Sequence, residues 1–178
     1  EICLEAVKQN GEALEFVNNK TPEICLAAVK QSGWALQYVE KQTDEICLEA
    51  VKQTVAALQF VKNITPEISS AAMKKEDFGR YFKHIKDQTP ELCLAAVKSY
   101  GFALQYVKNQ TPEICLEAIK EHPAALEYVK NQTPELCFEA IKEWPDLLSI
   151  VKEQTPEICL AAVKQNSYTL RFVKEQTP

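Results

Sequence analysis

The chain has 178 residues, of which 46% are hydrophobic and 25% are charged, a composition typical of folded proteins and not of disordered ones. Its formal net charge of −5 gives no general attraction to nucleic acid backbones or to acidic membranes. No segment approaches the roughly 20 consecutive apolar residues that cross a bilayer, and no basic region followed by an apolar one opens the chain as a secretion signal would.

A single motif recurs along the chain. Thr-Pro-Glu returns every 22 residues, with Thr-Asp-Glu at Thr43 and one interval of 24 residues between Thr65 and Thr89. A period this short predicts an all-α solenoid, in which each unit buries its apolar side against its neighbours. Because the chain lacks an initiator Met and begins within a unit, we expect it to be part of a longer protein. The eight predicted units form a single array and span 1–20, 21–42, 43–64, 65–88, 89–110, 111–132, 133–154 and 155–176, with 177–178 starting a further unit.

Each unit predicts two helices joined by a turn. With the Thr numbered as position 1, Thr caps the first helix, Pro occupies its first turn and Glu lies at the positive end of its dipole. Apolar residues at positions 4, 5, 6, 8 and 9, and again at 15, 16, 18 and 19, give both helices a buried face. Position 13 is glycine in three copies (Gly11, Gly33 and Gly101) and proline in two others (Pro123 and Pro145). We therefore expect the glycine to end the first helix in a left-handed cap and the proline to begin the second helix. We expect these hairpins to stack as a right-handed superhelix, with a closed globular bundle as the alternative.

The run PEICLAAVK, followed by a Gly turn and ALQYVKNQ, is found in close form at Pro22–Val39 and Pro90–Val107. It resembles the bacterial repeat family catalogued as domain of unknown function 4116. The resemblance covers almost the whole chain and implies a helical repeat of bacterial type, but no activity and no catalytic residues. The copy at 65–88 departs from the pattern, because Ser69 and Ser70 replace the Cys-Leu pair and two residues are inserted.

Seven cysteines share position 5. Neighbouring helices pack about 8–10 Å apart, which exceeds the Cα separation that a disulfide allows, so we predict free thiols that fill the core. Free thiols are typical of reducing compartments, so we expect a protein of the bacterial cytoplasm, or of the host cytosol if it is an effector. No zinc spacing, phosphate loop or nucleophile–base pair is found, and His84 and His122 lie in separate units, so we expect no enzyme activity, cofactor or metal. The cysteines are Cys3, Cys25, Cys47, Cys93, Cys115, Cys137 and Cys159.

Basic residues give weaker signals. Position 10 is Lys in all eight copies, but Glu at position 3 of every copy and at position 7 of four makes the stripe mixed in charge. We interpret these lysines as partners of the helix dipole and of Glu three residues earlier, and not as a phosphate site. In the copy at 65–88, five basic residues are clustered beside a turn that residues 76–79 lengthen. The longer turn indicates a local bend in the stack, and the basic residues indicate a small basic patch as the alternative. Those residues are Lys74, Lys75, Arg80, Lys83 and Lys86.

Positions 12 and 14, which flank the turn, vary freely between the copies and carry large aromatic rings in several of them. Such rings anchor protein interfaces, so we predict a non-catalytic protein–protein interaction or scaffolding module that binds its partner at this edge. The alternative for the rings is that each covers the core of its own hairpin. The alternative functions are a nucleic-acid-binding surface and a passive spacer. The predicted binding residues are Trp34, Tyr100, Phe102, Trp144 and Tyr168.

Overall fold

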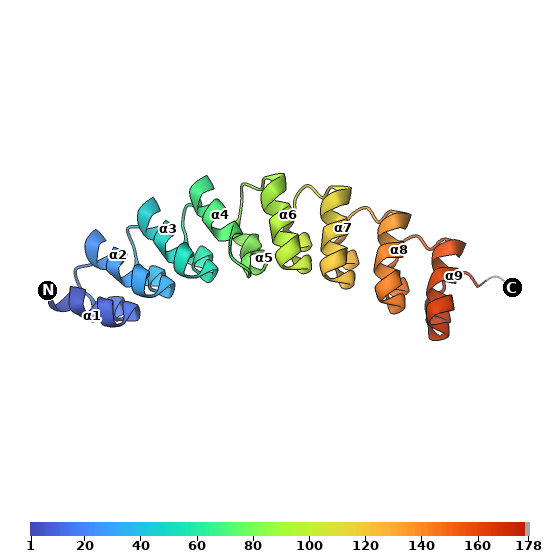
Figure 1. Ribbon diagram of the computed structural model, residues 1–178, viewed down its shortest axis with the longest axis horizontal. Helices are drawn as coiled ribbons and strands as arrows, with labels where there is room; N and C mark the ends of the chain where they lie inside the picture. The colour runs from blue at the N-terminus through green and yellow to red at the C-terminus, as the bar shows by residue number, and fades with distance from the viewer. Residues whose placement is uncertain (177–178) are drawn as a thin grey trace. The chain divides into compact units, whose positions relative to one another are not determined.

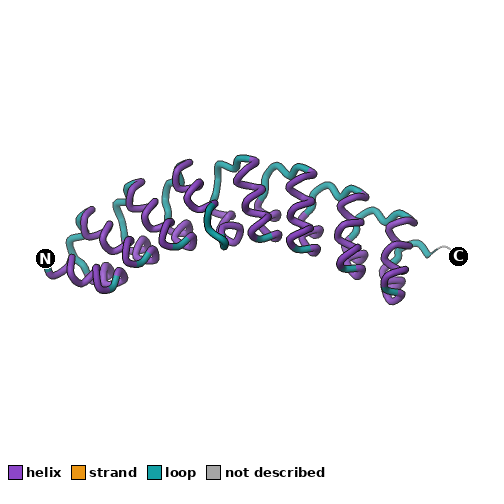
Figure 2. Tube along the Cα trace, in the orientation of Figure 1, coloured by secondary structure: helices purple, strands orange, loops and turns teal. Residues whose placement is uncertain are grey.

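The computed structural model describes residues 1–176, in which every regular element is helical and no strand occurs (Figures 1 and 2). An α-helix followed by a six-residue 3₁₀ helix repeats about every 22 residues, which confirms the predicted all-α repeat. The α-helices are α1 (Ile2–Gln9), α2 (Pro22–Gln31), α3 (Asp44–Gln53), α4 (Pro66–Met73), α5 (Phe78–Tyr81), α6 (Pro90–Ser99), α7 (Pro112–Glu121), α8 (Pro134–Glu143) and α9 (Pro156–Gln165). The 3₁₀ helices are η1 (Gly11–Phe16), η2 (Gly33–Tyr38), η3 (Val55–Phe60), η4 (Phe82–His84), η5 (Gly101–Tyr106), η6 (Pro123–Tyr128), η7 (Pro145–Ile150) and η8 (Ser167–Phe172).

The recurring threonine caps its α-helix as predicted. The hydroxyl oxygen of Thr21 accepts a hydrogen bond from the backbone N–H of Ile24 at 3.4 Å, and the threonines before α3, α4 and α6 to α9 make the same bond. This satisfies one of the N–H groups that a helix start leaves without an internal partner. Each cap depends only on residues three apart in the sequence, which is why the pattern alone located these helix starts.

In every repeat except that at 65–88 the second helix is a 3₁₀ helix, a distinction that the apolar pattern did not make. In η2, six residues lie between the extended residues Ser32 and Val39, and the Val39 N–H donates to the carbonyl of Leu36 at 3.1 Å. Three residues per turn place Leu36 and Val39 on the same side, and both are buried. A segment this short completes few bonds of the α type, so the tighter helix forms.

The prediction of left-handed glycine caps is wrong, since no glycine in residues 1–176 has a positive φ. The glycines at position 13 instead lie against the next unit. A Cβ atom on Gly33 would lie 2.5 Å from the carbonyl oxygen of Ala50, so any larger residue would force the two units apart. Pro123 and Pro145 begin η6 and η7, as predicted.

Contacts divide the chain into two compact units, one over Glu1–Asp87 and one from Gln88 onwards. In each unit, consecutive repeats pack side by side in two layers, one of α-helices and one of 3₁₀ helices. The core lies between these layers. In the repeat at 21–42, for example, Ala28 from the first layer and Leu36 from the second are fully buried.

The copy at 65–88 departs from the others. Its turn is longer, as predicted, because residues 74–77 separate α4 from α5, whereas a single residue separates the two helices of the other copies. The end of the segment expected to form the turn, 78–79, instead begins α5, which runs directly into η4. Phe78 and Phe82 from these helices are fully buried, and their ring centroids lie 5.7 Å apart in an edge-to-face arrangement. The two rings anchor α5 and η4 in the core, because large apolar rings need burial.

Within residues 1–176, none of the helices combines the length and apolarity that crossing a bilayer requires.

Candidate protein-interaction surface

Five rings from three consecutive copies meet beside the turns of the second compact unit. The centroid of the Phe102 ring lies 5.6 Å from that of Tyr100, 4.3 Å from that of His122 and 5.9 Å from that of Tyr128. His122 in turn lies 4.9 Å from Trp144. We call these five side chains the aromatic edge.

The corner between the two helices of each unit positions most of these rings. Tyr100, His122 and Trp144 share position 12, which both ends the α-helix and precedes the 3₁₀ helix. Their backbones are extended, with φ of −162°, −148° and −131°. One repeated corner therefore places one ring per copy on the same side of the unit, and Phe102, two residues into the corner of its own copy, joins two of them.

The contacts of the aromatic edge cross the boundaries between copies. Phe102 lies against two rings of the following copy, so it does more than cover its own hairpin. Trp144 remains 46% exposed, while the other four rings are half-buried. The result is an apolar surface whose rings are already ordered by one another, which lowers the entropy cost of binding.

Packing, and not hydrogen bonding at Nδ1, holds the central imidazole. The His122 Nδ1 atom is buried and has no hydrogen-bond partner among the described residues. The ring is enclosed by Phe102 on one side and Trp144 on the other. His122 was not among the predicted binding residues, although it shares position 12 with two of them, Tyr100 and Trp144.

The structure brings together Tyr100, Phe102 and Trp144 of the five predicted binding residues. Trp34 lies in the first compact unit, where it is 42% exposed and packs against Phe60 with ring centroids 5.9 Å apart. Tyr168, in η8, is exposed. Trp34 and Tyr168 are therefore not part of the aromatic edge, whereas His122 and Tyr128 complete it.

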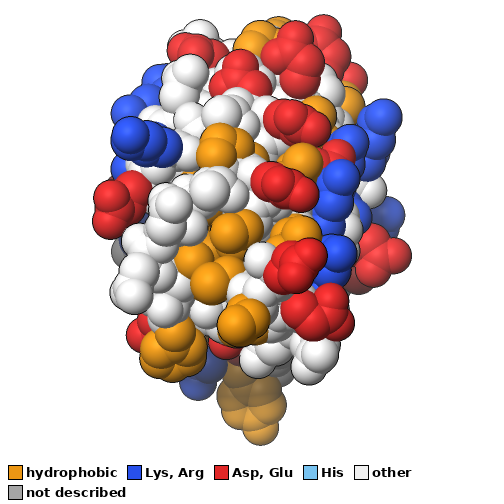
Figure 3. Space-filling model, turned by 90° about the vertical axis from the view of Figure 1, so that its left-hand side faces the viewer, with side chains coloured by type: hydrophobic (Ala, Val, Ile, Leu, Met, Phe, Trp, Pro, Cys, Tyr) orange, Lys and Arg blue, Asp and Glu red, His pale blue; other side chains and the backbone are white. Residues whose placement is uncertain are grey.

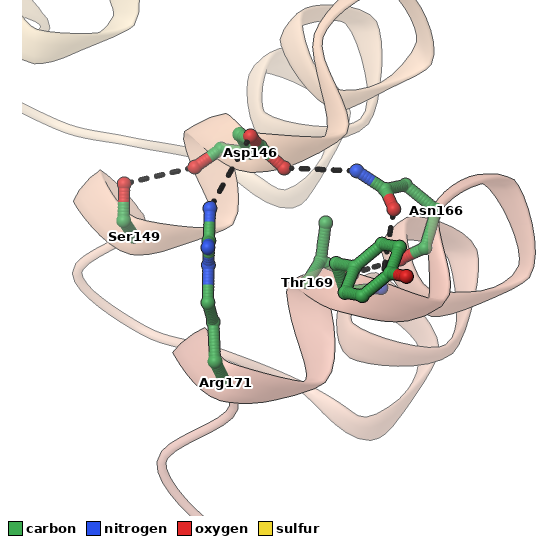
Figure 4. Close-up of polar contacts among 6 residues, drawn as sticks. Asp146, Ser149, Asn166, Thr169 and Arg171 are labelled. Carbon is green, nitrogen blue, oxygen red and sulfur yellow. Dashed lines mark hydrogen bonds and ion pairs between the residues drawn. The ribbon is translucent and has the colours of Figure 1, made fainter.

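A polar cluster lies between the copy that contains Trp144 and the copy that follows it (Figure 4). Asp146 accepts a hydrogen bond from Asn166 Nδ2 at 3.1 Å and forms an ion pair with Arg171 Nη2 at 3.7 Å. Ser149 Oγ donates to the backbone carbonyl of Asp146 at 2.8 Å. An apolar centre beside a polar border is the usual anatomy of a protein interface.

The basic residues of the copy at 65–88 have different surroundings. Lys83 and Lys86 line a hollow of about 280 Å³ together with His84. Burial and the neighbouring charge of Lys83 lower the pKa of His84. Arg80 forms an ion pair with Asp77 at 3.3 Å. The two remaining basic residues directly follow α4 and are Lys74 and Lys75.

The lysines of position 10 take part in the predicted ion pairs in two copies. Lys52 lies 2.6 Å from Glu49, and Lys120 lies 3.1 Å from Glu117. Lys98 reaches across to Glu117 in the following copy at 3.6 Å. Hydrogen bonding to Lys120 and the charges of both lysines lower the pKa of Glu117. Position 10 thus links copies as well as stabilising single helices.

The seven cysteines are free thiols. In Cys47, burial raises the pKa of the thiol to about 11, so it stays protonated near neutral pH and is a poor nucleophile. Its Sγ donates to Gln42 Oε1 at 3.5 Å. In the part of the chain that the structure describes, no cluster of three or more His, Cys, Asp or Glu side chains is arranged to hold a metal ion.

A glutamine at position 22, which is not among the residues predicted from the sequence, joins consecutive copies. Gln110 Nε2 donates to the carbonyl of Leu104 in its own copy at 3.1 Å and to that of Tyr128 in the next copy at 3.0 Å. Its Oε1 accepts from the backbone N–H of Lys130 at 2.9 Å. We call this residue the junction glutamine. The junction glutamines that bond to the following copy are Gln42, Gln88, Gln110, Gln132 and Gln154.

A lysine at position 20 adds to several of these junctions. Lys130 Nζ donates to the carbonyl of Lys108 in the preceding copy at 2.8 Å. Lys152 and Lys174 repeat this bond to the copy before them, at 3.1 and 2.9 Å. The loops between copies are therefore tied together by polar side chains as well as by the apolar core.

Comparison with known proteins identifies one family. The family described as a domain of unknown function, DUF4116, matches residues 21–64 and 89–133. Each matched segment covers two consecutive copies of the repeat, so the domain corresponds to a pair of units. No curated protein and no solved structure matches the chain.

Proposed function

The chain belongs to the DUF4116 family, and from that premise we propose that it is a non-catalytic protein–protein interaction or scaffolding module. We propose further that its repeats form an α-solenoid, wound as a right-handed superhelix, in the bacterial cytoplasm or, for an effector, the host cytosol. The free thiols support a reducing compartment, because oxidising compartments favour disulfides.

The aromatic edge is the observation that carries this proposal. Trp144 leaves 46% of its surface exposed although it packs against the ring of His122, which in turn packs against Phe102. Tryptophan and tyrosine are the residues that most often dominate binding free energy at protein interfaces. A partner that covers Trp144 would bury a large apolar area on a surface that is already ordered.

The charges around this edge favour a protein partner over nucleic acid. Glu121 accepts a hydrogen bond from the backbone N–H of Gly101 at the base of the aromatic edge, and Glu143 directly precedes Trp144. Asp146 follows Trp144 two residues later. Phosphate groups would be repelled by Glu121 and Glu143, whereas a protein surface with Lys or Arg beside an apolar side chain would complement them. Asp146 is already paired with Arg171.

The test begins with a binding partner captured on the immobilised chain from a lysate, identified by mass spectrometry and purified. We expect Trp144→Ala to weaken binding of that partner at least about tenfold, as loss of an interface anchor does, with little change in melting temperature. Phe138→Ala is the matched control, because this ring is 38% exposed but lies on α8, outside the aromatic edge.

Two results would count against the proposal. In one, Trp144→Ala lowers the melting temperature while binding per folded molecule is unchanged, which would make the ring a structural cap. In the other, the chain binds DNA or RNA oligonucleotides with an affinity that falls steeply as salt rises, which would favour the nucleic-acid alternative.

A further inference from the structure

The junction between the copies at 43–64 and 65–88 has no junction glutamine. Position 22 is Ile64 here. At the junction before it, Gln42 donates to the carbonyl of Phe60 at 2.8 Å and accepts from the backbone N–H of Lys62 at 2.9 Å. An isoleucine side chain supplies apolar bulk but neither of these hydrogen bonds.

The residue that faces position 22 has changed as well. In other copies the cysteine at position 5 donates to the junction glutamine before it, as Cys47 does to Gln42 Oε1 at 3.5 Å and Cys115 to Gln110 Oε1 at 3.8 Å. The copy at 65–88 has Ser69 at this position, and its side chain is only 6% exposed. A hydroxyl is a stronger donor than a thiol, yet the Ile64 side chain offers it no acceptor.

A hollow of about 280 Å³ lies at this altered junction. Both Ile64 and Ser69 line it, together with the apolar side chains of Leu58, Val61 and Ile85. All of the residues that line the hollow lie in the first compact unit. The exchange of glutamine and cysteine for isoleucine and serine therefore coincides with a cavity whose wall is partly apolar.

Lysines outnumber carboxylates around this hollow. Lys62, Lys83 and Lys86 line it, against Asp87 alone. Among the described residues, neither Lys62 nor Lys83 takes part in an ion pair. The chain as a whole has a net charge of −5, and on the face that Figure 3 shows acidic side chains lie among the basic ones, so this excess of lysine is local. The hollow complements a negative charge.

His84 also lines the hollow. Burial and the charge of Lys83 lower the pKa of the His84 imidazole, so the ring is neutral near pH 7 and can donate from one of its nitrogens. An anion beside Lys83 would offset the charge of that lysine and favour the protonated ring. Binding of an anion should therefore raise the pKa of His84.

We propose that the hollow binds a small organic carboxylate, which supplies the oxygen acceptor that Ile64 lacks. A carboxylate on a short alkyl chain has the shape of the glutamine side chain used at the other junctions. Its oxygens can accept from Ser69, its charge is favoured by the lysines, and its alkyl part can lie against the apolar wall. Inorganic phosphate fits less well, because it has no apolar part to place there.

The first test is a titration of the 178-residue chain with butanoate at constant ionic strength, followed by NMR. We expect a dissociation constant of about 1–10 mM, as befits so small a ligand. The imidazole signals of His84 should move and its pKa should rise. The chain has two histidines, and His122 is the internal control, because it lies in the aromatic edge of the second compact unit and should not respond.

Two further ligands test the chemistry of recognition. Butanamide has the same carbon chain without the charge and should bind at least about tenfold more weakly, because charge-assisted hydrogen bonds are lost. Inorganic phosphate should also bind more weakly than butanoate. The proposal is overturned if His84 does not respond to about 50 mM butanoate, or if either of the other ligands binds as tightly. An equal response of His84 and His122 would reveal adventitious binding and overturn it as well.

Substitutions locate the site. Lys83→Gln removes a cation from the exposed rim and should weaken butanoate binding at least about fivefold, read from the backbone amide signal of Ile85. Lys74→Gln is the matched control, because this exposed lysine belongs to the same copy but does not line the hollow, and it should leave the affinity unchanged. Equal effects of the two substitutions would mean that general charge attracts the ligand, which contradicts a built site.

Restoring the glutamine gives a test in the opposite direction. Ile64→Gln places a carboxamide at the junction, where it can accept from Ser69 and compete with the ligand for the hollow. We expect this variant to lose butanoate binding and to melt at a higher temperature than the unaltered chain. If it binds butanoate as the unaltered chain does, the ligand does not replace the glutamine side chain and the proposal fails. Circular dichroism shows whether each variant keeps its helices, and Lys83→Gln decides if Ile64→Gln does not fold.

Discussion

Replacing the junction glutamine Gln110 by alanine removes a weak hydrogen bond from the Cys115 Sγ at 3.8 Å and three hydrogen bonds to backbone groups. Two are donated by Nε2, to Leu104 at 3.1 Å and to Tyr128 at 3.0 Å, and one is accepted by Oε1 from Lys130 at 2.9 Å. The bonds to Tyr128 and Lys130 cross from one copy to the next, so the substitution loosens a junction and not a single helix.

The expected loss of stability in Gln110→Ala follows from how deeply the bonded groups are buried. A hydrogen bond contributes about 0.5–1.5 kcal/mol net, and a buried partner left without one costs about 1–3 kcal/mol. The carbonyl of Leu104 belongs to a fully buried residue, whereas the Lys130 N–H lies near the surface, where water can replace the glutamine oxygen. We therefore expect Gln110→Ala to lower the free energy of unfolding by about 2–3 kcal/mol.

Urea unfolding followed by circular dichroism gives the change in stability, and amide hydrogen exchange gives its location. The Lys130 amide should exchange faster in the variant, although it lies 20 residues from the substitution. Gln105→Ala is the matched control, because Gln105 is exposed and makes one local bond to the carbonyl of Phe102 at 3.0 Å. Its expected effect is below about 0.5 kcal/mol.

The reasoning would be refuted if Gln110→Ala cost no more than the control, or if stability fell while exchange of the Lys130 amide stayed the same. The first result would mean that apolar packing alone sets the strength of the junction. The second would mean that the loss comes from elsewhere in the copy.

Three other substitutions and conditions test the account of the repeat. Gly33→Ala places a methyl group 2.5 Å from the Ala50 carbonyl oxygen and should lower the free energy of unfolding by about 1–3 kcal/mol in urea titrations, whereas the neighbouring Ser32→Ala should change it little. Thr111→Ala removes a helix cap and should cost about 1 kcal/mol by the same assay, and recovery of that loss in Thr111→Ser would identify the hydroxyl as its cause. The pKa of Cys47 is raised from 9.0 to about 11 in the folded state, so this thiol favours folding below pH 9.0 and loses that contribution as pH rises to about 11. Stability should therefore fall over this range, and less steeply in Cys47→Ala; equal slopes would exclude the thiol as the source.

The aromatic edge illustrates how much of the candidate site the sequence revealed. Comparison of the copies with one another pointed to positions 12 and 14 and so to Tyr100, Phe102 and Trp144. It did not reveal His122 as the link between Phe102 and Trp144, because a histidine alone in a turn suggests solvent or packing. It also grouped Trp34 with these rings, although that side chain packs in the other compact unit. Shared positions predict a shared side of the fold, but not which side chains touch.

The sequence by itself determined the period, the helix starts and the residue types of the core, because these depend on contacts within one turn of helix. Thr111 capping Ile114 is of this kind. Only the tertiary structure decided the roles of Gly33 and Gln110. Both act on atoms of the next copy, the Ala50 carbonyl for Gly33 and the Lys130 amide for Gln110, and those atoms come within reach only once the copies have packed.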